Sequence, residues 1–263
     1  VVHADHLWKA ARSWNRDKEC WKIISTKEIL ASGDLKKQRW WIPLASPAAH
    51  VEKSHIIPPY TIGAMIGDGH FGDHAIELCG DDKEIFDRVA NEMHEELEFR
   101  FEKNSENSTT YFGARICPKI RYAENPYRDA LIDIGLHAKL SYDKFIPDEY
   151  LYDSIPNRIA LLQGLMDTDG TASNEGYCTF YTTSFKLAKD VLQLVQSLGG
   201  YGKVQGDLHG REDDQRPEYL VSISFADRDF PVFSLMRKQQ RLIENANKPK
   251  AKRRGKRLFI ESI

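Results

Sequence analysis

The chain has 263 residues, of which 41% are hydrophobic and 29% charged, and its formal net charge at pH 7 is −2. These values are typical of a folded globular protein of two domains or one large one, and the near-neutral total excludes a generic polycation. There is no run of 18 apolar residues and no basic start followed by an apolar stretch. We therefore expect no membrane span, no secretory signal and a cytoplasmic location.

The cysteines are few and widely separated. Cys20, Cys79, Cys117 and Cys178 form no CxxC pair, so they predict neither a disulfide framework nor a zinc site. A reducing compartment is the setting that this usage favours.

The N-terminal segment differs from the rest in composition. All five tryptophans lie within the first 41 residues, which predicts a separate module over residues 1–55. The stretch "STKEILAS" predicts a helix in it with Ser25 or Thr26 as the N-cap. Pro58 and Pro59 mark the entry to the next helix.

The remainder consists of two similar halves, expected at residues 56–152 and 153–247, followed by a basic tail at 248–263. Each half opens with a helix that ends in an aspartate, and Asp68 and Asp169 are 101 residues apart. This spacing predicts a duplicated domain whose copies pack about a pseudo-twofold axis. Hydrophobic periodicity places the helices at residues 59–68, 82–99, 125–136, 158–169, 184–199 and 230–244. The expected strands are residues 74–80, 109–118, 177–183, 201–207 and 218–225.

Small residues recur on one face of both opening helices. Gly63 and Gly67 are four residues apart, as are Gly164 and Thr168. A glycine inside a helix costs about 1 kcal/mol relative to alanine, and close packing of the two helices accounts for it. The glycine after each aspartate suits a left-handed cap that ends the helix.

Parallel packing of these helices brings Asp68 and Asp169 together at the negative ends of two helix dipoles. Each carboxylate then raises the pKa of the other, and a divalent cation resolves the conflict. Mg²⁺ suits two carboxylates and the free carbonyls of the last turn, and such a metal can activate water and stabilise the leaving oxygen of a phosphodiester. A single aspartate before a glycine is more simply a helix end, whereas two equivalent copies favour a metal site.

The segments "TIGAMIGDG" and "LQGLMDTDG" resemble the two LAGLIDADG motifs of a single-chain homing endonuclease. The second segment keeps Leu162, Gly164, Leu165, Asp167, Asp169 and Gly170. The first keeps Gly63, Asp68 and Gly69, with Ile66 where an acid often stands. The resemblance covers residues 56 to about 245.

The resemblance implies an α+β fold of two αββαββα halves whose curved antiparallel sheets form a DNA-binding saddle. It implies a monomeric enzyme that cuts both strands of a long asymmetric DNA target and leaves short 3′ overhangs, with no membrane partner. Asp68 and Asp169 would hold Mg²⁺, or Mn²⁺ or Ca²⁺ in its place, with the carbonyls of Gly67 and Thr168 as further ligands. The alternative is a catalytically decayed relative that binds nucleic acid, as an RNA maturase or a transcription regulator.

The family also carries basic residues near the metals. Lys144 in "YDKFIP" and Lys238 in "LMRKQQ" are the matching positions, with Arg237 as a rival to the second. Their implied role is to stabilise charge or to position the attacking water. Asp167 is left out of the catalytic set because Ile66 occupies the equivalent position.

Strand alternation selects the side chains that face the DNA. Cys178, Phe180 and Thr182 are expected toward the helices, as are the odd-numbered residues from 219 to 225. The expected DNA contacts are Tyr177, Thr179, Tyr181, Thr183, Lys203, Gln205, Ser222, Ser224, Arg115, Lys119 and Arg121. A slip of one residue in register would invert each assignment.

The two ends suggest the wider context. "VVHADHLWKA" and "KRLFIESI" resemble segments of an intein, which makes the chain the endonuclease portion of one; with Val1 and Ile263 at its ends it is not expected to splice. The N-terminal module can instead be an accessory DNA-binding or docking region. Between Met236 and Arg257 ten basic residues stand against one acid, which predicts either phosphate contacts or a solvated tail.

Overall fold

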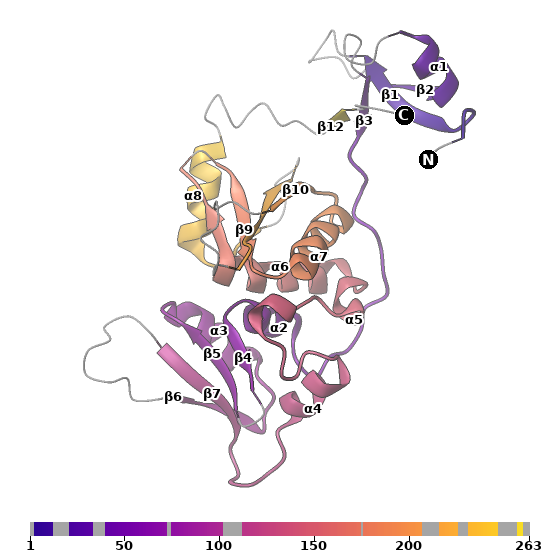
Figure 1. Ribbon diagram of the computed structural model, residues 1–263. Coiled ribbons are helices and arrows are strands. Elements are labelled where there is room, and N and C mark those ends of the chain that lie inside the picture. The colour runs from indigo at the N-terminus through magenta and orange to yellow at the C-terminus, as the bar shows by residue number, and fades with distance from the viewer. Residues whose placement is uncertain are drawn as a thin grey trace.

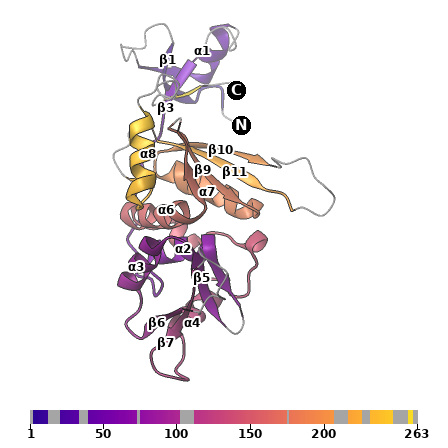
Figure 2. The same ribbon diagram turned by 90° about the vertical axis from the view of Figure 1, so that its left-hand side faces the viewer.

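The computed structural model describes residues 3–12, 21–33, 40–72, 75–101, 112–174, 176–206, 216–225, 231–246 and 257–259. Within these ranges the chain forms three four-stranded antiparallel sheets. Two sheets lie on either side of a central helix pair, α2 (Pro59–Asp68) and α6 (Ile155–Asp169), and the third stands apart at one end (Figures 1 and 2). None of the described helices has the length and apolar character needed to cross a membrane.

The two halves have the same order of elements, αββαββα, as expected. After α2, the first half contains β4 (Gly69–Phe71), β5 (Ile76–Gly80), α3 (Lys83–Glu92), β6 (Leu97–Phe101), β7 (Phe112–Pro118) and α4 (Pro126–Asp133). After α6, the second contains β8 (Gly170–Ala172), β9 (Cys178–Thr182), α7 (Phe185–Ser197), β10 (Tyr201–Gly206), β11 (Tyr219–Ser224) and α8 (Met236–Ala246). The strand orders β4-β5-β7-β6 and β8-β9-β11-β10 are equivalent. A short 3₁₀ helix (Ser141–Asp143) and α5 (Asp148–Leu151) connect the halves.

Two expected helices are too long. The helix predicted at 82–99 ends at Glu92, because the backbone turns to an extended conformation at Met93 (ψ 145°) and residues 97–101 form strand β6. Phe99 from that strand packs edge-on against Phe86 of α3, with ring centroids 5.5 Å apart. The helix predicted at 230–244 begins only at Met236. Periodicity continued across both boundaries because buried strand or loop residues happened to extend the helical stripe.

The central helices touch backbone to backbone, as the small residues predicted. A Cβ on Gly63 would lie 2.4 Å from the carbonyl oxygen of Leu161, and one on Gly164 would lie 2.2 Å from that of Tyr60. No side chain fits in either gap, so these glycines set the separation of α2 and α6. The same contact brings the C-terminal ends of the two helices together.

The sheets pack their inner faces on helices, and the predicted alternation holds in the second half. Cys178, Phe180, Val221 and Ile223 are buried, whereas their neighbours in β9 and β11 are partly exposed. Thr182, expected in the core, is only partly buried at the end of β9. The outer face of the sheet in the second half is therefore fixed in register.

The N-terminal sheet joins both ends of the described chain. It consists of β1 (Leu7–Arg12), β2 (Lys22–Ser25), β3 (Trp40–Pro43) and β12 (Arg257–Phe259), in the order β12-β3-β1-β2. Helix α1 (Thr26–Ala31) follows β2, and Ser25 caps it in a reciprocal arrangement with Glu28. Residues 257–259 of the expected tail thus belong to this sheet, while residues 248–256 and 260–263 lie outside the described part of the chain.

The connection from β3 to α2 is held against the second half. Arg158 of α6 is buried and donates to the carbonyl oxygens of Ala48 and Ser197. The Asp153 carboxylate accepts from the Lys53 backbone N–H (2.9 Å) and lies 2.6 Å from Nε2 of His55. Residues 48–55 are therefore anchored on Asp153 and Arg158, at the start of α6.

Candidate metal centre

Asp68 and Asp169 are the last residues of α2 and α6. The glycine that follows each is extended, with φ −88° at Gly69 and −94° at Gly170, and not in the expected left-handed cap. Glycine is required for a different reason: a Cβ would lie 2.3 Å from the carbonyl oxygen of Met65 at Gly69, and 2.4 Å from that of Met166 at Gly170. The extended backbone leads each helix directly into a short strand, β4 or β8, which the sequence did not predict.

The two carboxylates share one electrostatic environment. Burial, followed by the charge of Asp68, raises the pKa of Asp169 to about 7. Burial also raises the pKa of Asp68, and the positive charges of Lys144 and Lys238 oppose that rise. Two partly buried carboxylates at adjacent helix C-termini form a centre that favours a cation.

Lys144 covers the end of α2. Its ammonium is almost fully buried, and burial lowers its pKa to about 8 against the opposing charges of Asp169 and Asp68. The ammonium donates to the carbonyl oxygens of Met65 (3.3 Å), Ile66 (2.8 Å), Gly67 (3.2 Å) and Gly69 (2.7 Å).

Lys238 covers the end of α6 in the same way. Its ammonium donates to the carbonyl oxygens of Met166 (3.4 Å), Asp167 (2.6 Å), Thr168 (3.5 Å) and Gly170 (2.8 Å). Every acceptor is 101 positions after the corresponding acceptor of Lys144, so the two halves match atom for atom at the centre. The rival residue, Arg237, pairs with Asp82 instead.

Both carbonyls expected to bind metal, those of Gly67 and Thr168, thus already accept from a lysine. A carbonyl oxygen has two lone pairs, so a second interaction is compatible with this arrangement. The donor set of two carboxylates and two carbonyls consists of hard oxygens and fits Mg²⁺. The described residues contain no cluster of three or more histidine, cysteine or acidic side chains that could hold a metal, either at this centre or elsewhere.

Hollows lie beside the centre and contain residues that the sequence did not single out. One, of about 260 Å³, is lined by Lys144, Asp169, Tyr181, Thr183 and Glu218, among others. A second, of about 470 Å³, includes Asp68, His70, Lys139 and Arg216. No motif marks His70, Lys139, Arg216 and Glu218, because they reach the centre from β4 and from loops only through the tertiary fold.

The predicted DNA contacts of the second half line up across its sheet. Lys203 of β10 lies opposite Ser222 of β11, which lies opposite Thr179 of β9. The Thr179 hydroxyl is 2.6 Å from that of Thr171 in β8. The row therefore crosses all four strands. The remaining expected contacts of this half, Tyr177, Tyr181, Thr183, Gln205 and Ser224, are partly or fully exposed.

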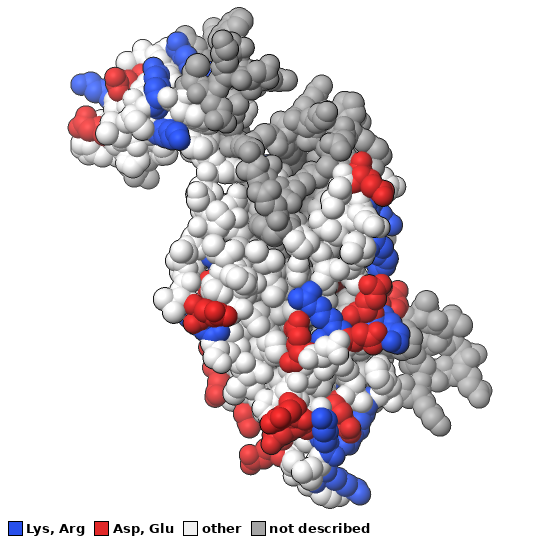
Figure 3. Space-filling model, turned by 180° about the vertical axis from the view of Figure 1, so that it is seen from behind, with Lys and Arg blue, Asp and Glu red and all other residues white. Residues whose placement is uncertain are grey.

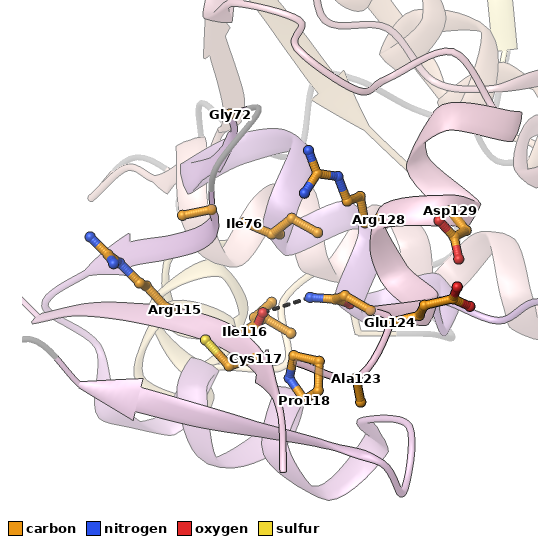
Figure 4. Close-up of a pocket in the computed structure, with 12 residues that line it drawn as sticks. Gly72, Ile76, Arg115, Ile116, Cys117, Pro118, Ala123, Glu124, Arg128 and Asp129 are labelled. Atoms are coloured by element: carbon orange, nitrogen blue, oxygen red, sulfur yellow. Dashed lines mark hydrogen bonds between the residues drawn. The ribbon is translucent and has the colours of Figure 1, made fainter. Parts of the chain in front are cut away.

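The expected contacts of the first half are more scattered. Arg115 of β7 points out from the sheet and pairs with Glu77 of β5 (3.1 Å). It lines a hollow of about 470 Å³ that also contains Arg128 of α4 (Figure 4). Lys119 and Arg121 lie beyond the end of β7, where Lys119 donates to the carbonyl oxygen of Glu95 (2.6 Å). These two residues are not on the sheet.

Charges of both signs mix on the surface. On the face opposite to that of Figure 1, the described acidic and basic side chains gather side by side (Figure 3). This distribution agrees with a net charge of −2. The described part of this face is therefore not uniformly basic.

The chain thus contains a repeated αββαββα unit, with an aspartate and a lysine at the end of each central helix. Residues 156–247 match the family model of the LAGLIDADG-like domain.

The chain is similar to two proteins described as replicative DNA helicase DnaB. It is 30% identical over 188 residues to that of Mycobacterium intracellulare, covering 71% of this chain and 26% of the relative. It is 24% identical over 246 residues to that of Rhodothermus marinus, covering 84% of this chain and 23% of the relative. The chain thus spans about a quarter of the length of these relatives.

Among solved structures, the fold is similar to the homing endonuclease I-DmoI. A mesophilic variant of it gives a TM-score of 0.42 at 13% identity, covering 72% of this chain and 94% of that one. Its complex with DNA and Ca gives 0.41 at 14% identity, covering 64% and 83%.

Proposed function

We propose that this protein is a site-specific endonuclease that hydrolyses both strands of a DNA duplex. The observation that supports this most is the duplicated arrangement of aspartate and buried lysine at the adjoining ends of α2 and α6. A duplex presents two phosphodiesters related by an approximate twofold axis, and this centre offers two equivalent sets of groups about such an axis.

The carboxylates of Asp68 and Asp169 and the carbonyls of Gly67 and Thr168 would hold Mg²⁺, and Mn²⁺ or Ca²⁺ could occupy the same place. When bound, the metal supplies an activated water and stabilisation of the leaving oxygen. The raised pKa of Asp169 supports this assignment, since a nearby cation stabilises the charged carboxylate that burial disfavours.

Lys144 and Lys238 would stabilise negative charge on the phosphodiester of each strand. Their ammonium groups are held by backbone carbonyls, so they are positioned before DNA binds. Removal of either would affect the strand on its own side of the twofold axis.

The outer faces of the two large sheets would lie along the DNA major groove, which admits a two-stranded β-ribbon. The outward side chains of the two sheets differ in sequence, which supports a long asymmetric target read by a monomer. Cleavage across the minor groove between the two sets of groups would leave short 3′ overhangs.

The N-terminal sheet supports an origin as the endonuclease portion of an intein. Its strands β3 and β12 lie on either side of both LAGLIDADG halves in sequence but are paired in space, so the endonuclease interrupts a separate folding unit. The similarity to much longer DnaB helicases supports a host gene of that kind. An accessory DNA-binding role for the module is the other hypothesis.

The test is cleavage of a plasmid library with a randomised insert by the purified chain with Mg²⁺, followed by sequencing of the cut ends. We expect a single long target cut on both strands, and no product with EDTA. Tight binding of a selected sequence without any cleavage in Mg²⁺ would instead support a decayed, nucleic-acid-binding relative.

A further inference from the structure

Asp167 lies in the second motif, at the position that the apolar Ile66 occupies in the first motif. Its side chain is only 1% exposed, so its charge is not offered to solvent or to a metal at the surface of the centre. A buried carboxylate is costly unless hydrogen bonds satisfy it, and Asp167 accepts several.

The partners of Asp167 come mainly from the start of α8. Its Oδ1 accepts from the backbone N–H groups of Ser234 (3.0 Å) and Leu235 (3.2 Å). Its Oδ2 accepts from the hydroxyl of Ser234 and from that of Tyr60 (2.9 Å). Ser234 and Leu235 immediately precede α8, whose first N–H groups have no partner within the helix. Asp167 therefore fixes the position of that helix start.

Asp167 also accepts a hydrogen bond from Lys238. The first turn of α8 closes on the carbonyl oxygen of Leu235, which accepts from the backbone N–H of Lys238 (3.0 Å). The side chain of Lys238 then returns to the carbonyl oxygen of Asp167, 2.6 Å away. Asp167 thus holds the helix through its carboxylate and accepts the lysine through its backbone.

The first half positions its lysine, Lys144, from a different kind of element. Lys144 is the residue that follows a 3₁₀ helix (Ser141–Asp143), and its ammonium lies on the carbonyl of Ile66 without any carboxylate at that position. The phenol of Tyr60, from α2, also contacts Asp167, and the Arg88 guanidinium lies 3.7 Å above the Tyr60 ring. The Tyr60 hydroxyl also accepts from the hydroxyl of Ser234 (3.4 Å), so Tyr60 contacts both Asp167 and its partner at the start of α8.

We propose that Asp167 is a positioning residue that places Lys238 on the end of α6, so that one of the two equivalent lysines depends on it and the other does not. The inference about cleavage rests on the proposed nuclease function, whereas the inference about Lys238 placement does not. The two are therefore tested by separate measurements.

The first measurement is NMR of the full chain with ¹³Cε-labelled lysine. The resonances of Lys238 and Lys144 are assigned by their loss in Lys238→Met and Lys144→Met. In Asp167→Asn we expect the Lys238 resonance to move to the position of exposed lysines while that of Lys144 stays. Ser234→Ala, which weakens the same anchor with less risk to folding, should give a smaller shift in the same direction.

Tyr60→Phe is the matched control. It removes a donor to the same carboxylate and the acceptor of the long Ser234 hydroxyl contact (3.4 Å), but it leaves the bonds that Asp167 accepts from Ser234 and Leu235, so the Lys238 resonance should not move. A Lys238 resonance that is unchanged in both Asp167→Asn and Ser234→Ala, or one that moves equally in Tyr60→Phe, would overturn the assignment.

The second measurement uses the selected DNA target with each strand labelled separately. Asp167→Asn should slow one strand by about 10- to 100-fold, as expected for a displaced catalytic group, and leave the other within about threefold. In a Lys238→Met background the same change should have little further effect. Equal slowing of both strands contradicts the inference, whereas a wild-type chain that cuts neither strand contradicts only the proposed function.

Discussion

Lys144 shows how a single residue can be prepared for chemistry by the backbone around it. Its ammonium lies against four carbonyl oxygens at the end of α2. The negative charges of both aspartates stabilise its charged form, which opposes the lowering of its pKa by burial. The negative end of a helix dipole and the two carboxylates offset part of the cost of burying the ammonium. Lys238 repeats the arrangement from a different element.

Lys144→Met should lower the rate of cleavage by about 100- to 1,000-fold, the usual cost of removing a group that stabilises developing charge. Lys144→Arg should restore little, because a planar guanidinium cannot reproduce the compact contacts of the ammonium with four carbonyls. Single-turnover cleavage of the selected target, with binding measured in Ca²⁺, checks this. Full activity in Lys144→Met would refute a role for this lysine.

At the scale of residues, the sequence alone predicted where the aspartates and the small residues of the centre lie. The aspartates and small residues lie within two short motifs, so spacing alone placed them on one helix face. The lysines needed the family resemblance, because Lys144 is 76 residues from Asp68 in the chain. The role of Asp167 was missed, since only the fold shows that its partners, Ser234 and Leu235, begin another helix.

At the scale of elements, glycines set the separation between α2 and α6. Gly63→Ala would place a methyl group 2.4 Å from the Leu161 carbonyl oxygen and should destabilise the protein by about 1–3 kcal/mol through overpacking. Gly113→Ala is the control, since nothing lies within 4 Å of its added methyl. Urea unfolding followed by far-UV circular dichroism measures both, and equal stability of the two variants would be inconsistent with backbone contact between the helices.

Asp153 anchors residues 48–55 at the start of α6. Asp153→Ala should cost about 3 kcal/mol, since it removes a buried acceptor and leaves His55 and backbone N–H groups without it. Glu52→Ala, an exposed acid in the same segment, should change the free energy of unfolding by less than about 0.5 kcal/mol. Similar unfolding midpoints for both variants would rule out the anchor.

Stability should also depend on the charge of Asp153. Burial raises its pKa, but hydrogen bonds from His55, Ser154 and Lys53 more than offset this, and the net pKa is lowered. A lowered folded-state pKa means that the stabilisation is present above the unfolded value of about 3.9 and is lost as the pH falls below it. The difference in unfolding free energy between wild type and Asp153→Ala should therefore shrink in acid. A difference that is constant between pH 6 and pH 3 would argue against an ionised anchor.

The boundaries of elements were predicted less well than their order. The helix expected at 82–99 contained a strand because Leu97 continued the apolar stripe of α3, and alternation over five residues could not outweigh it. Strands β4 and β8 have three residues each, too few for any pattern to identify. Pairing with β5 and β9 creates them.

At the scale of the whole molecule, the chain combines a duplicated body with a small sheet that has its own core of Ala10, Ile24, Ile29 and Trp40. All five tryptophans lie in the first 41 residues, so their fluorescence reports on the N-terminal segment. Because a small core gives little stability, the fluorescence transition in urea should precede that of circular dichroism. A single coincident transition would show that the sheet and the body unfold together.

The central claim is that Asp68 and Asp169 jointly hold the catalytic metal, and the most direct measurement compares wild type with Asp169→Asn on the selected DNA target in Mg²⁺. We predict that the variant binds the target with unchanged affinity in the absence of metal but cuts neither strand at a measurable rate. Cleavage by Asp169→Asn at the wild-type rate would contradict the account.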